Sequence, residues 1–379
     1  MKKLKNYLSY EPRRDNIKLC FIGNGDIHVL RWIKYFAEKG YEVSWITLCD
    51  VVPSNGIKVF NLEPLDYFNP KNIFRVWQLV IKIKKIIKEI KPNILHVHQI
   101  SSLAYIIPLI KFHPYILSAW GSDILLRPNE KKLYSFLASN TIKKADLLHC
   151  DGFKTHNALE KLGGSSGKII RIYYGTNTDK FNPQKRSNEL RNQLGIGSSL
   201  MIISTRHLYP IYDIETLICA IPKVLKSVPD AKFVIVGSGP QNEVLQKLAK
   251  DLRVGNNTVF TGRFSASEIP KYYASADIYV STSLSDAGLA ASTAEAMACG
   301  LPVIVTEDPD NRYWIKDGIN GFIIPIKNPE ILAKRIIKLV NYKNLRKEMG
   351  ERNRKLIVEK NNYYIEMSKM EIIYKNICN

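Results

Sequence analysis

The sequence predicts an α/β protein built from two Rossmann-like, doubly wound domains that face a central cleft. From about residue 17 onward, short apolar segments alternate with segments of helical periodicity, a pattern typical of parallel sheets flanked by helices. The chain has 379 residues, a length typical of about two domains. A polar, turn-rich stretch over residues 177–187 interrupts the series, and a fresh apolar segment begins at residue 200. We therefore expect a linker between two similar α/β domains.

The first domain is predicted over residues 1–185. Apolar residues at helical spacing over 29–39, followed by Gly40, predict its first helix, and similar segments separate most of its strands. The strands themselves are expected at residues 18–23, 42–48, 57–62, 94–98, 115–120, 147–150 and 168–174.

The second domain is predicted over residues 186–355. Its strands are expected at residues 200–206, 232–236, 258–262, 278–283, 302–306 and 321–325, with closing helical stretches from Pro329, Asn344 and Tyr363. Residues 356–379 are expected to form a C-terminal helix that packs back on the first domain.

Composition limits the partners and the location of the protein. The formal charge of +20 predicts an anionic partner. The sequence lacks zinc-finger spacing, an RNP-like motif and a basic region with heptads, so we expect no nucleic-acid partner. The six cysteines are scattered without a CxxC pair, which indicates a reducing compartment and no metal site. The basic N-terminus lacks the apolar core of a signal peptide, and no run reaches roughly 18 apolar residues. We therefore expect a cytoplasmic protein.

One basic segment, residues 74–91, has two interpretations. Its isoleucines spread over much of a helix circumference, and its lysines occupy the remainder. It is either a sheet-flanking helix whose lysines extend into solvent or a helix that attaches peripherally to an anionic membrane surface, on the inner face of the cell membrane.

Polar residues follow several strands of the first domain. Gly25 lies in a Gly-x-Gly turn after the first strand, where a ligand would approach the backbone closely, although an ordinary tight turn explains it equally well. His96 and His98 share one face of their strand, and His98 lies nearer the ligand-binding end. Asp123 follows Trp120-Gly-Ser and would bind sugar hydroxyls or cap a helix. We treat His98 and Asp123 as catalytic candidates.

The second domain carries a longer series of candidates at successive strand ends. An arginine such as Arg206 suits a diphosphate because its donors form a fixed fork. A small-residue loop leads into a helix whose N-terminus would present free N–H groups to phosphate or sugar oxygens, and a carboxylate lies two turns along that helix. The Asp308-Pro-Asp310 sequence sits in a turn-rich loop and is not expected to bind metal. The candidates are Arg206, Gly237, Gly239, Gly262, Phe264, Asp286, Gly288, Leu289, Ala290 and Glu295.

Residues 281–325 resemble the donor-site segment of the retaining GT-B glycosyltransferases of family 4, the glycosyl transferases group 1 class. The resemblance rests on Glu295-Ala-Met-Ala-Cys-Gly-Leu-Pro and on Asp317-Gly-Ile-Asn-Gly. Val236-Gly-Ser-Gly-Pro is similar to the Gly-x-Gly-Pro turn of that family, and Gly25 matches its N-terminal glycine loop. The similarity extends over about residues 17–355.

This resemblance implies a role for each matching residue. Glu295 would bind the ribose hydroxyls of a sugar nucleotide, and Arg206 would face its diphosphate. The amides of residues 288–290 would hold phosphate and donor-sugar oxygens. Asp286 would serve the donor-sugar hydroxyls as a catalytic group from a shifted loop. The sugar nucleotide is a substrate, and no cofactor is implied. No divalent metal is expected, because Arg206 and helix N-termini would stabilise the departing diphosphate.

The sequence departs from the family pattern at three positions. Ala287 stands where the first of two glutamates is usual, and Asp286 lies one place earlier. Tyr212 stands where a basic residue commonly follows the arginine, and Trp120 replaces a frequent histidine.

The resemblance implies a retaining hexosyltransferase that moves sugar from a nucleoside-diphosphate sugar to a hydroxyl of a glycan or lipid-linked acceptor, in surface polysaccharide or glycoconjugate synthesis. Two alternatives remain: a sugar-nucleotide epimerase of the same fold, and a non-enzymatic protein that binds anionic surfaces.

Overall fold

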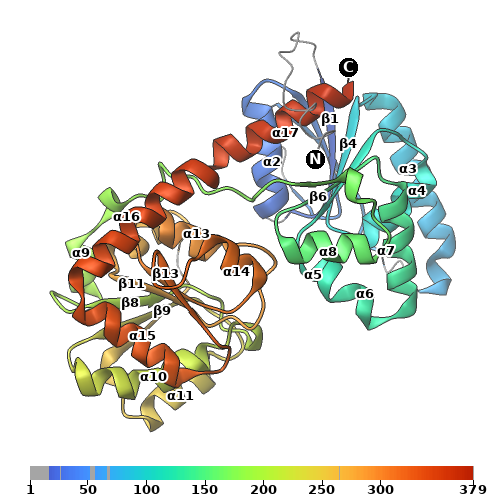
Figure 1. Cartoon of the computed structure of the whole chain (residues 1–379). Coiled ribbons are helices and arrows are strands. Elements are labelled where there is room, and N and C mark those ends of the chain that lie inside the picture. Colours follow the sequence, from blue (N-terminus) through green and yellow to red (C-terminus); the bar gives the residue numbers. More distant parts are fainter. Residues whose placement is uncertain (1–16, 26, 52–55, 66–68, 264, 379) are drawn as a thin grey trace. The chain divides into compact units, whose positions relative to one another are not determined.

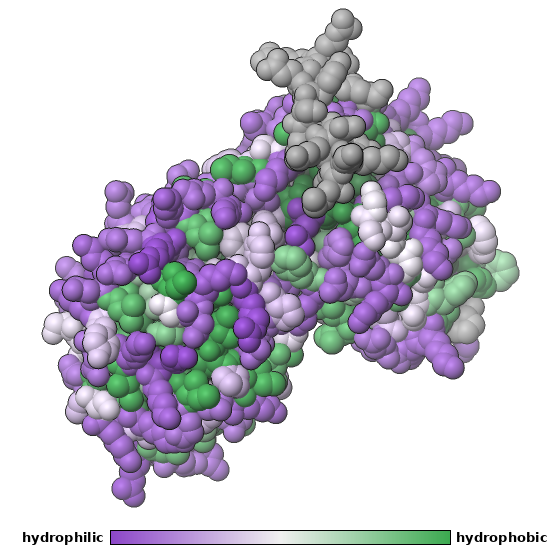
Figure 2. All heavy atoms as spheres, in the orientation of Figure 1, coloured by the Kyte–Doolittle hydropathy of each residue, from purple (hydrophilic) through white to green (hydrophobic). Residues whose placement is uncertain are grey.

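A computed structural model describes residues 17–25, 27–51, 56–65, 69–263 and 265–378. The described residues belong to two compact units (Figure 1). The first unit contains the chain up to Tyr174 and again from Ile365 onward, and the second unit contains residues 175–364. Purple, hydrophilic residues cover much of the face seen in Figure 2, and a cluster of buried apolar residues forms the core of each unit.

A parallel sheet forms the centre of the first unit, with the strand order β3-β2-β1-β4-β5-β6-β7. The order reverses between β1 and β4, and ligands of doubly wound proteins bind near such a reversal, at the carboxyl ends of the strands. The strands are β1 (Lys18–Ile22), β2 (Glu42–Thr47), β3 (Ile57–Asn61), β4 (Ile94–His98), β5 (Tyr115–Ala119), β6 (Leu147–Cys150) and β7 (Ile169–Arg171).

Helices cover both faces of this sheet. On one face, α3, α4, α7 and α8 bury apolar side chains against strand residues such as Leu95, Val97 and Leu117. On the other face, Phe36 of α2 and Tyr374 of α17 pack with Phe21 and His96. The helices of this unit are α2 (Ile27–Glu38), α3 (Ile73–Ile90), α4 (Ser102–Ile110), α5 (Ser122–Leu125), α6 (Arg127–Glu130), α7 (Lys132–Lys144), α8 (Phe153–Lys161) and, from residue 365, α17 (Tyr363–Cys378).

The second unit has its own parallel sheet, with the strand order β10-β9-β8-β11-β12-β13. Helices connect the strands in chain order, and the connection from β10 through α12 crosses back to place β11 beside β8. The strands are β8 (Met201–Ser204), β9 (Lys232–Val236), β10 (Thr258–Gly262), β11 (Ile278–Ser281), β12 (Val303–Thr306) and β13 (Gly321–Ile324).

The core of the second unit lies between this sheet and α10, α11 and α15, while α12 and α13 contact each other and α13 also contacts β11 and β12. A Cβ atom on Gly350 would lie 2.0 Å from the carbonyl oxygen of Gly300, so α16 packs backbone to backbone at the end of α13. The helices are α9 (Asn188–Gln193), α10 (Ile214–Ser227), α11 (Asn242–Asp251), α12 (Ile269–Ser275), α13 (Ala291–Ala298), α14 (Pro309–Trp314), α15 (Pro329–Asn341) and α16 (Lys343–Lys360).

Residues 175–185, which lie within the predicted first domain, belong to the second unit instead. The Arg354 guanidinium of α16 donates hydrogen bonds to the carbonyl oxygens of Thr178 (3.0 Å), Phe181 (2.6 Å) and Ala298 (2.8 Å). A planar group with several donors is suited to gathering three carbonyls. At the other end of the chain, Glu366 of α17 accepts a hydrogen bond from the Tyr173 amide at 2.9 Å, so α17 is fixed to the first unit.

Candidate functional site

The glycine turn after β9 touches the segment that follows β8. Adding a Cβ atom at Gly239 would place it 2.3 Å from the Leu208 carbonyl oxygen, and one at Gly237 would lie 2.5 Å from that of Arg206. Hydrogen bonds join the same segments, from the Leu208 amide to the Ser238 carbonyl and from the Gln241 amide to the Leu208 carbonyl, both at 3.1 Å. Only glycine fits such close backbone approaches, which explains both predicted glycines.

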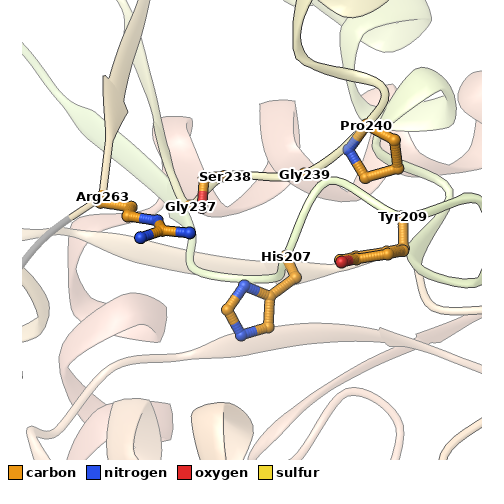
Figure 3. Close-up of a pocket in the computed structure, with 7 residues that line it drawn as sticks. All are labelled: His207, Tyr209, Gly237, Ser238, Gly239, Pro240 and Arg263. Carbon is orange, nitrogen blue, oxygen red and sulfur yellow. The ribbon is translucent and has the colours of Figure 1, made fainter.

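A cavity of about 790 Å³ opens beside this turn. In Figure 3, Arg263 extends from the end of β10 on one side, Tyr209 lies on the other, and the His207 ring stands between them. The volume is within the range of small-molecule sites. The lining combines a cation, two rings and backbone polar groups, and its residues are His207, Tyr209, Gly237, Ser238, Gly239, Pro240 and Arg263.

The sequence predicted only part of this cavity. Gly237 and Gly239 line it, and Gly262 ends β10 with φ +67° just before Arg263. The predicted Phe264 lies outside the described residues. His207, Tyr209 and Arg263 were not among the candidates, although each lies within three residues of a strand-end residue that was. Their position one to three residues after those candidates was the signal that would have identified them.

Arg206, which follows β8, is buried and held on several sides. Its guanidinium forms an ion pair with Asp286, donates to the Ser292 hydroxyl at 3.0 Å and lies 4.3 Å from the centre of the Tyr212 ring. Burial alone would lower the pKa of Arg206, but the neighbouring Asp286 carboxylate, together with Tyr279 and Tyr212, offsets this, and the pKa is raised. The guanidinium therefore stays charged in a fixed plane.

The predicted loop and carboxylate follow β11 in the order that the sequence indicates. Gly288 has φ +119°, which favours glycine. Leu289 is buried, Ala290 precedes the first residue of α13, and Glu295 lies on that helix. Burial, and then the charge of Glu295, raise the pKa of the Tyr273 hydroxyl far above its ordinary value. The structure thus brings Asp286 and Arg206 into contact at the sheet edge from which α13 begins.

In the first unit, His98 and Gly25 lie at the carboxyl edge of the sheet. The His98 side chain is buried, and its ring stacks on that of Trp120 with centroids 5.7 Å apart and an angle of 12°. The Gly25 amide donates to the Cys49 sulfur at 3.3 Å. His98 is thus part of an aromatic cluster in which Trp120 is partly exposed.

Asp123 holds two loops together. Its carboxylate accepts hydrogen bonds from the amides of Ile100 (2.8 Å), Gly121 (2.7 Å) and Trp120 (3.1 Å). These bonds join the loop after β4 to the loop after β5 and turn the carboxylate toward the backbone. The contacts favour a positioning role for Asp123 over direct contact with a ligand.

A chain of buried hydrogen bonds crosses this sheet. It runs from the Tyr374 hydroxyl to His96 Nδ1, from His96 Nε2 to the Ser118 hydroxyl (2.7 Å), from that hydroxyl to His149 Nδ1 (2.8 Å), and from His149 Nε2 to the Ile172 carbonyl (3.0 Å). Because a carbonyl only accepts, His149 carries its proton on Nε2, and its Nδ1 accepts from the Ser118 hydroxyl. That hydroxyl in turn accepts from His96 Nε2, and His96 Nδ1 accepts from the Tyr374 hydroxyl. Burial lowers the pKa of His149 to about 4 and that of His96 well below its usual range.

Metal and membrane features are limited in the described part of the chain. No group of three or more histidine, cysteine, aspartate or glutamate side chains there is arranged to hold a metal ion. Asp308 caps α14 by accepting from the Asp310 amide at 3.0 Å. None of the described helices combines the length and apolar character needed to span a bilayer.

Comparisons with known proteins agree with this geometry. Residues 186–356 match the family described as Glycosyl transferases group 1, and residues 18–152 match Glycosyl transferase 4-like. Over 168 residues the chain is 32% identical to the GDP-mannose-dependent alpha-(1-6)-phosphatidylinositol monomannoside mannosyltransferase of Mycolicibacterium smegmatis, a match that covers 42% of this chain and 44% of that enzyme. An uncharacterized glycosyltransferase of Methanocaldococcus jannaschii is 25% identical over 94% of this chain and 96% of its own.

Solved structures show the same fold. A glycosyltransferase of Rickettsia africae superposes with a TM-score of 0.81 at 19% identity, over 96% of this chain and 99% of its own. Anabaena HepE, solved in complex with UDP-glucose, superposes with a TM-score of 0.77 at 20% identity, over 94% and 98% of the two chains. The two sheets are therefore those of GT-B proteins.

Proposed function

Because the chain belongs to the glycosyl transferases group 1 class of GT-B glycosyltransferases, we propose that it transfers a hexose from a nucleoside-diphosphate sugar to a hydroxyl of a glycan or lipid-linked acceptor, with retention of configuration. The observation that carries this proposal is the cluster at one edge of the second sheet. A buried arginine, a glycine turn beside a cavity and a helix-borne glutamate occur there together.

Each part of this cluster suits one part of the donor. The Arg206 fork would bind the diphosphate, and the amides before α13 would bind phosphate and sugar oxygens. Glu295 would accept hydrogen bonds from the ribose hydroxyls. The cavity beside Arg263 would hold the base. The departing diphosphate would be stabilised by these fixed donors, with no step that requires a metal.

The first unit would bind the acceptor. The aromatic cluster of His98 and Trp120 lies at the carboxyl edge of its sheet, where α/β proteins bind ligands. A partly exposed aromatic ring such as Trp120 offers a flat apolar face to a sugar ring. Gly25 would let the acceptor or the donor sugar approach the backbone after β1.

Thermal unfolding with millimolar UDP, GDP, CDP or ADP tests the donor site. A nucleotide present at about 100 times its Kd stabilises a protein by about 2.7 kcal/mol. We expect one nucleotide to stabilise the protein, Glu295→Ala to abolish the effect, and the matched Glu359→Ala on the exposed face of α16 to retain it. Absence of any nucleotide response would contradict the proposal.

We further propose that α3 attaches the protein to an anionic membrane, so that the acceptor is lipid-linked. Phe74, Trp77 and Ile81 recur at three and four residues and are 79%, 50% and 51% exposed. Lys84, Lys85 and Lys88 follow on the exposed side of the same helix. Exposed aromatic residues followed by lysines are typical of helices that lie in a membrane interface.

A small cavity beside α3 adds to this surface. Its volume is about 190 Å³. Four residues of α3 and two residues of the preceding segment line it, namely Arg75, Gln78, Leu79 and Lys82, and Glu63 and Leu65. Arg75 faces Glu63 at 3.7 Å. The cationic side chains of this cavity would meet lipid phosphates while Phe74 and Trp77 enter the acyl boundary.

Vesicle sedimentation tests the attachment. The vesicles contain phosphatidylglycerol and phosphatidylcholine in a ratio of about 3:7. Since each lysine near an anionic surface contributes about 1 kcal/mol, replacing Lys84, Lys85 and Lys88 with glutamine should weaken binding about 100-fold. The matched control changes three exposed lysines of α16, Lys343, Lys347 and Lys355. Equal binding of both triple variants would rule out α3 as the attachment site.

A further inference from the structure

Asp286 pairs with the guanidinium of Arg206, the group proposed above to bind the diphosphate. The two side chains form an ion pair, and each is only 10% exposed. Ser292 accepts a second hydrogen bond from Arg206 and is itself bonded by the Tyr279 hydroxyl at 2.9 Å. Two nitrogens of the guanidinium, Nη1 and Nη2, are thus engaged before any donor arrives, whereas the buried Nε has no hydrogen-bond partner among the described residues.

Among the described residues, those around this pair add no positive charge that is shielded from solvent. Tyr212 contributes a ring against the guanidinium face. Arg263 lies on the exposed wall of the cavity, and His207 is also exposed there. Of the charged residues of the described site, Arg206, Asp286 and Glu295 are largely shielded from solvent, which gives one cation and two carboxylates. An arriving diphosphate adds its negative charges directly beside the Asp286 carboxylate.

We propose that Asp286 is an exchangeable counter-ion of Arg206, which lets the enzyme hold its intact donor more tightly than the nucleoside diphosphate it releases. This inference rests on the proposed donor site. When the donor binds, its diphosphate takes the guanidinium edge, and the displaced carboxylate accepts hydrogen bonds from hydroxyls of the donor hexose. After transfer the hexose is gone, and the carboxylate is left beside the diphosphate without those donors.

Like charges placed together at a binding site weaken binding strongly. The released nucleoside diphosphate is therefore disfavoured by Asp286, whereas the intact donor supplies hydroxyl groups that satisfy the same carboxylate. The aspartate thus promotes product release. It also prevents an unpaired buried arginine in the empty enzyme, an arrangement that is costly.

Calorimetric titration of Asp286→Asn tests the exchange. The probes are the nucleoside diphosphate that stabilises the wild type among UDP, GDP, CDP and ADP, and the glucose and mannose derivatives of that nucleotide. The amide keeps the size of the side chain and loses its charge. We expect Asp286→Asn to bind the free diphosphate about tenfold more tightly, and the preference for the intact donor over the diphosphate to fall by at least tenfold.

Three further proteins complete the test. Asp286→Glu retains the charge and should retain the wild-type preference for the donor. Asp286→Ala also removes the carboxylate and should likewise tighten diphosphate binding. It takes the place of the asparagine variant if that variant does not fold. Asp230→Asn removes one exposed charge just before β9, at the opposite end of the strand from the site, and should bind both probes like the wild type.

The outcomes separate this inference from the proposed function. If the wild type binds none of the nucleotides, the donor site itself is refuted. If the wild type binds one of them and both uncharged variants bind it equally or more weakly, the counter-ion role is wrong, and Asp286 only fixes the position of Arg206.

Discussion

Acidification should destabilise the first unit through its buried histidines, and His149→Gln should remove part of that effect. The folded-state pKa of His149 is about 4, whereas an unfolded histidine has a pKa of about 6.5. Above pH 6.5 the residue is neutral in both states, and its contribution to stability is fully present. As the pH falls from 7 to 5, the unfolded state gains a proton and the folded state does not, which lowers the free energy of unfolding by about 2 kcal/mol.

His96 acts in the same direction, because burial and the charges of His98 and His149 lower its pKa. The glutamine variant retains one donor and one acceptor for Ser118 and Ile172 but cannot take up the proton. Its loss of stability between pH 7 and pH 5 should therefore be about 2 kcal/mol smaller than that of the wild type, even though the variant is less stable at pH 7.

Urea denaturation followed by tryptophan fluorescence measures this difference, because Trp32, Trp45, Trp77 and Trp120 all lie in the first unit. A difference of 2 kcal/mol corresponds to a midpoint shift on the order of 1 M urea. The matched control is His207→Gln, since that side chain lies on the surface of the second unit. If the wild type and His149→Gln lose equal stability on acidification, the directed hydrogen-bond chain is not present as described.

Three further outcomes follow from the packing. Gly239→Ala should destabilise the second unit by about 3 kcal/mol or displace the turn, because its Cβ would meet the Leu208 carbonyl. Thermal unfolding and nucleotide binding measure these effects, and the control Gly255→Ala, whose Cβ would meet nothing within 4 Å, should be nearly neutral. Asp123→Ala should lower the free energy of unfolding, measured by urea denaturation, by about 3 kcal/mol, because three amides lose their acceptor. Unchanged stability with lost turnover would instead support a catalytic role. Residues 175–364 expressed alone should fold and bind the same nucleotide as the whole chain, because this contiguous unit has its own core; a fragment that unfolds without cooperativity would contradict this.

The order of strands and helices was predictable because local patterns determine it. Apolar runs such as 94–98 and 232–236 are buried on both faces of a sheet, so they stand out as continuous hydrophobic segments. Their predicted bounds match those of β4 and β9. The predicted ends of other strands, such as 168–174 for β7 (Ile169–Arg171), extend too far, because apolar residues continue beyond the last ladder hydrogen bond.

Side-chain partnerships were less predictable, because they depend on contacts between distant segments. The pairing of His96 with Tyr374 joins residues 278 positions apart, and no local pattern marks it. Asp123 was an acidic residue after a strand, and its three amide partners become visible only when two loops meet. The glycines at 237 and 239 were predictable because a close backbone approach permits only one residue type.

The stacking of Arg206 on Tyr212 explains how the site tolerates a tyrosine where the resemblance expects a cation. A guanidinium binds a ring through its face and an anion through its edge. Tyr212 therefore fixes the plane of Arg206 while leaving the edge to Asp286 or, in the proposed donor complex, to a diphosphate. A lysine ammonium has no such face and edge. Arg206→Lys should consequently weaken nucleotide binding nearly as much as Arg206→Ala, by about 2 kcal/mol or more. Binding by Arg206→Lys close to that of the wild type would show that charge alone, and not the oriented fork, holds the diphosphate.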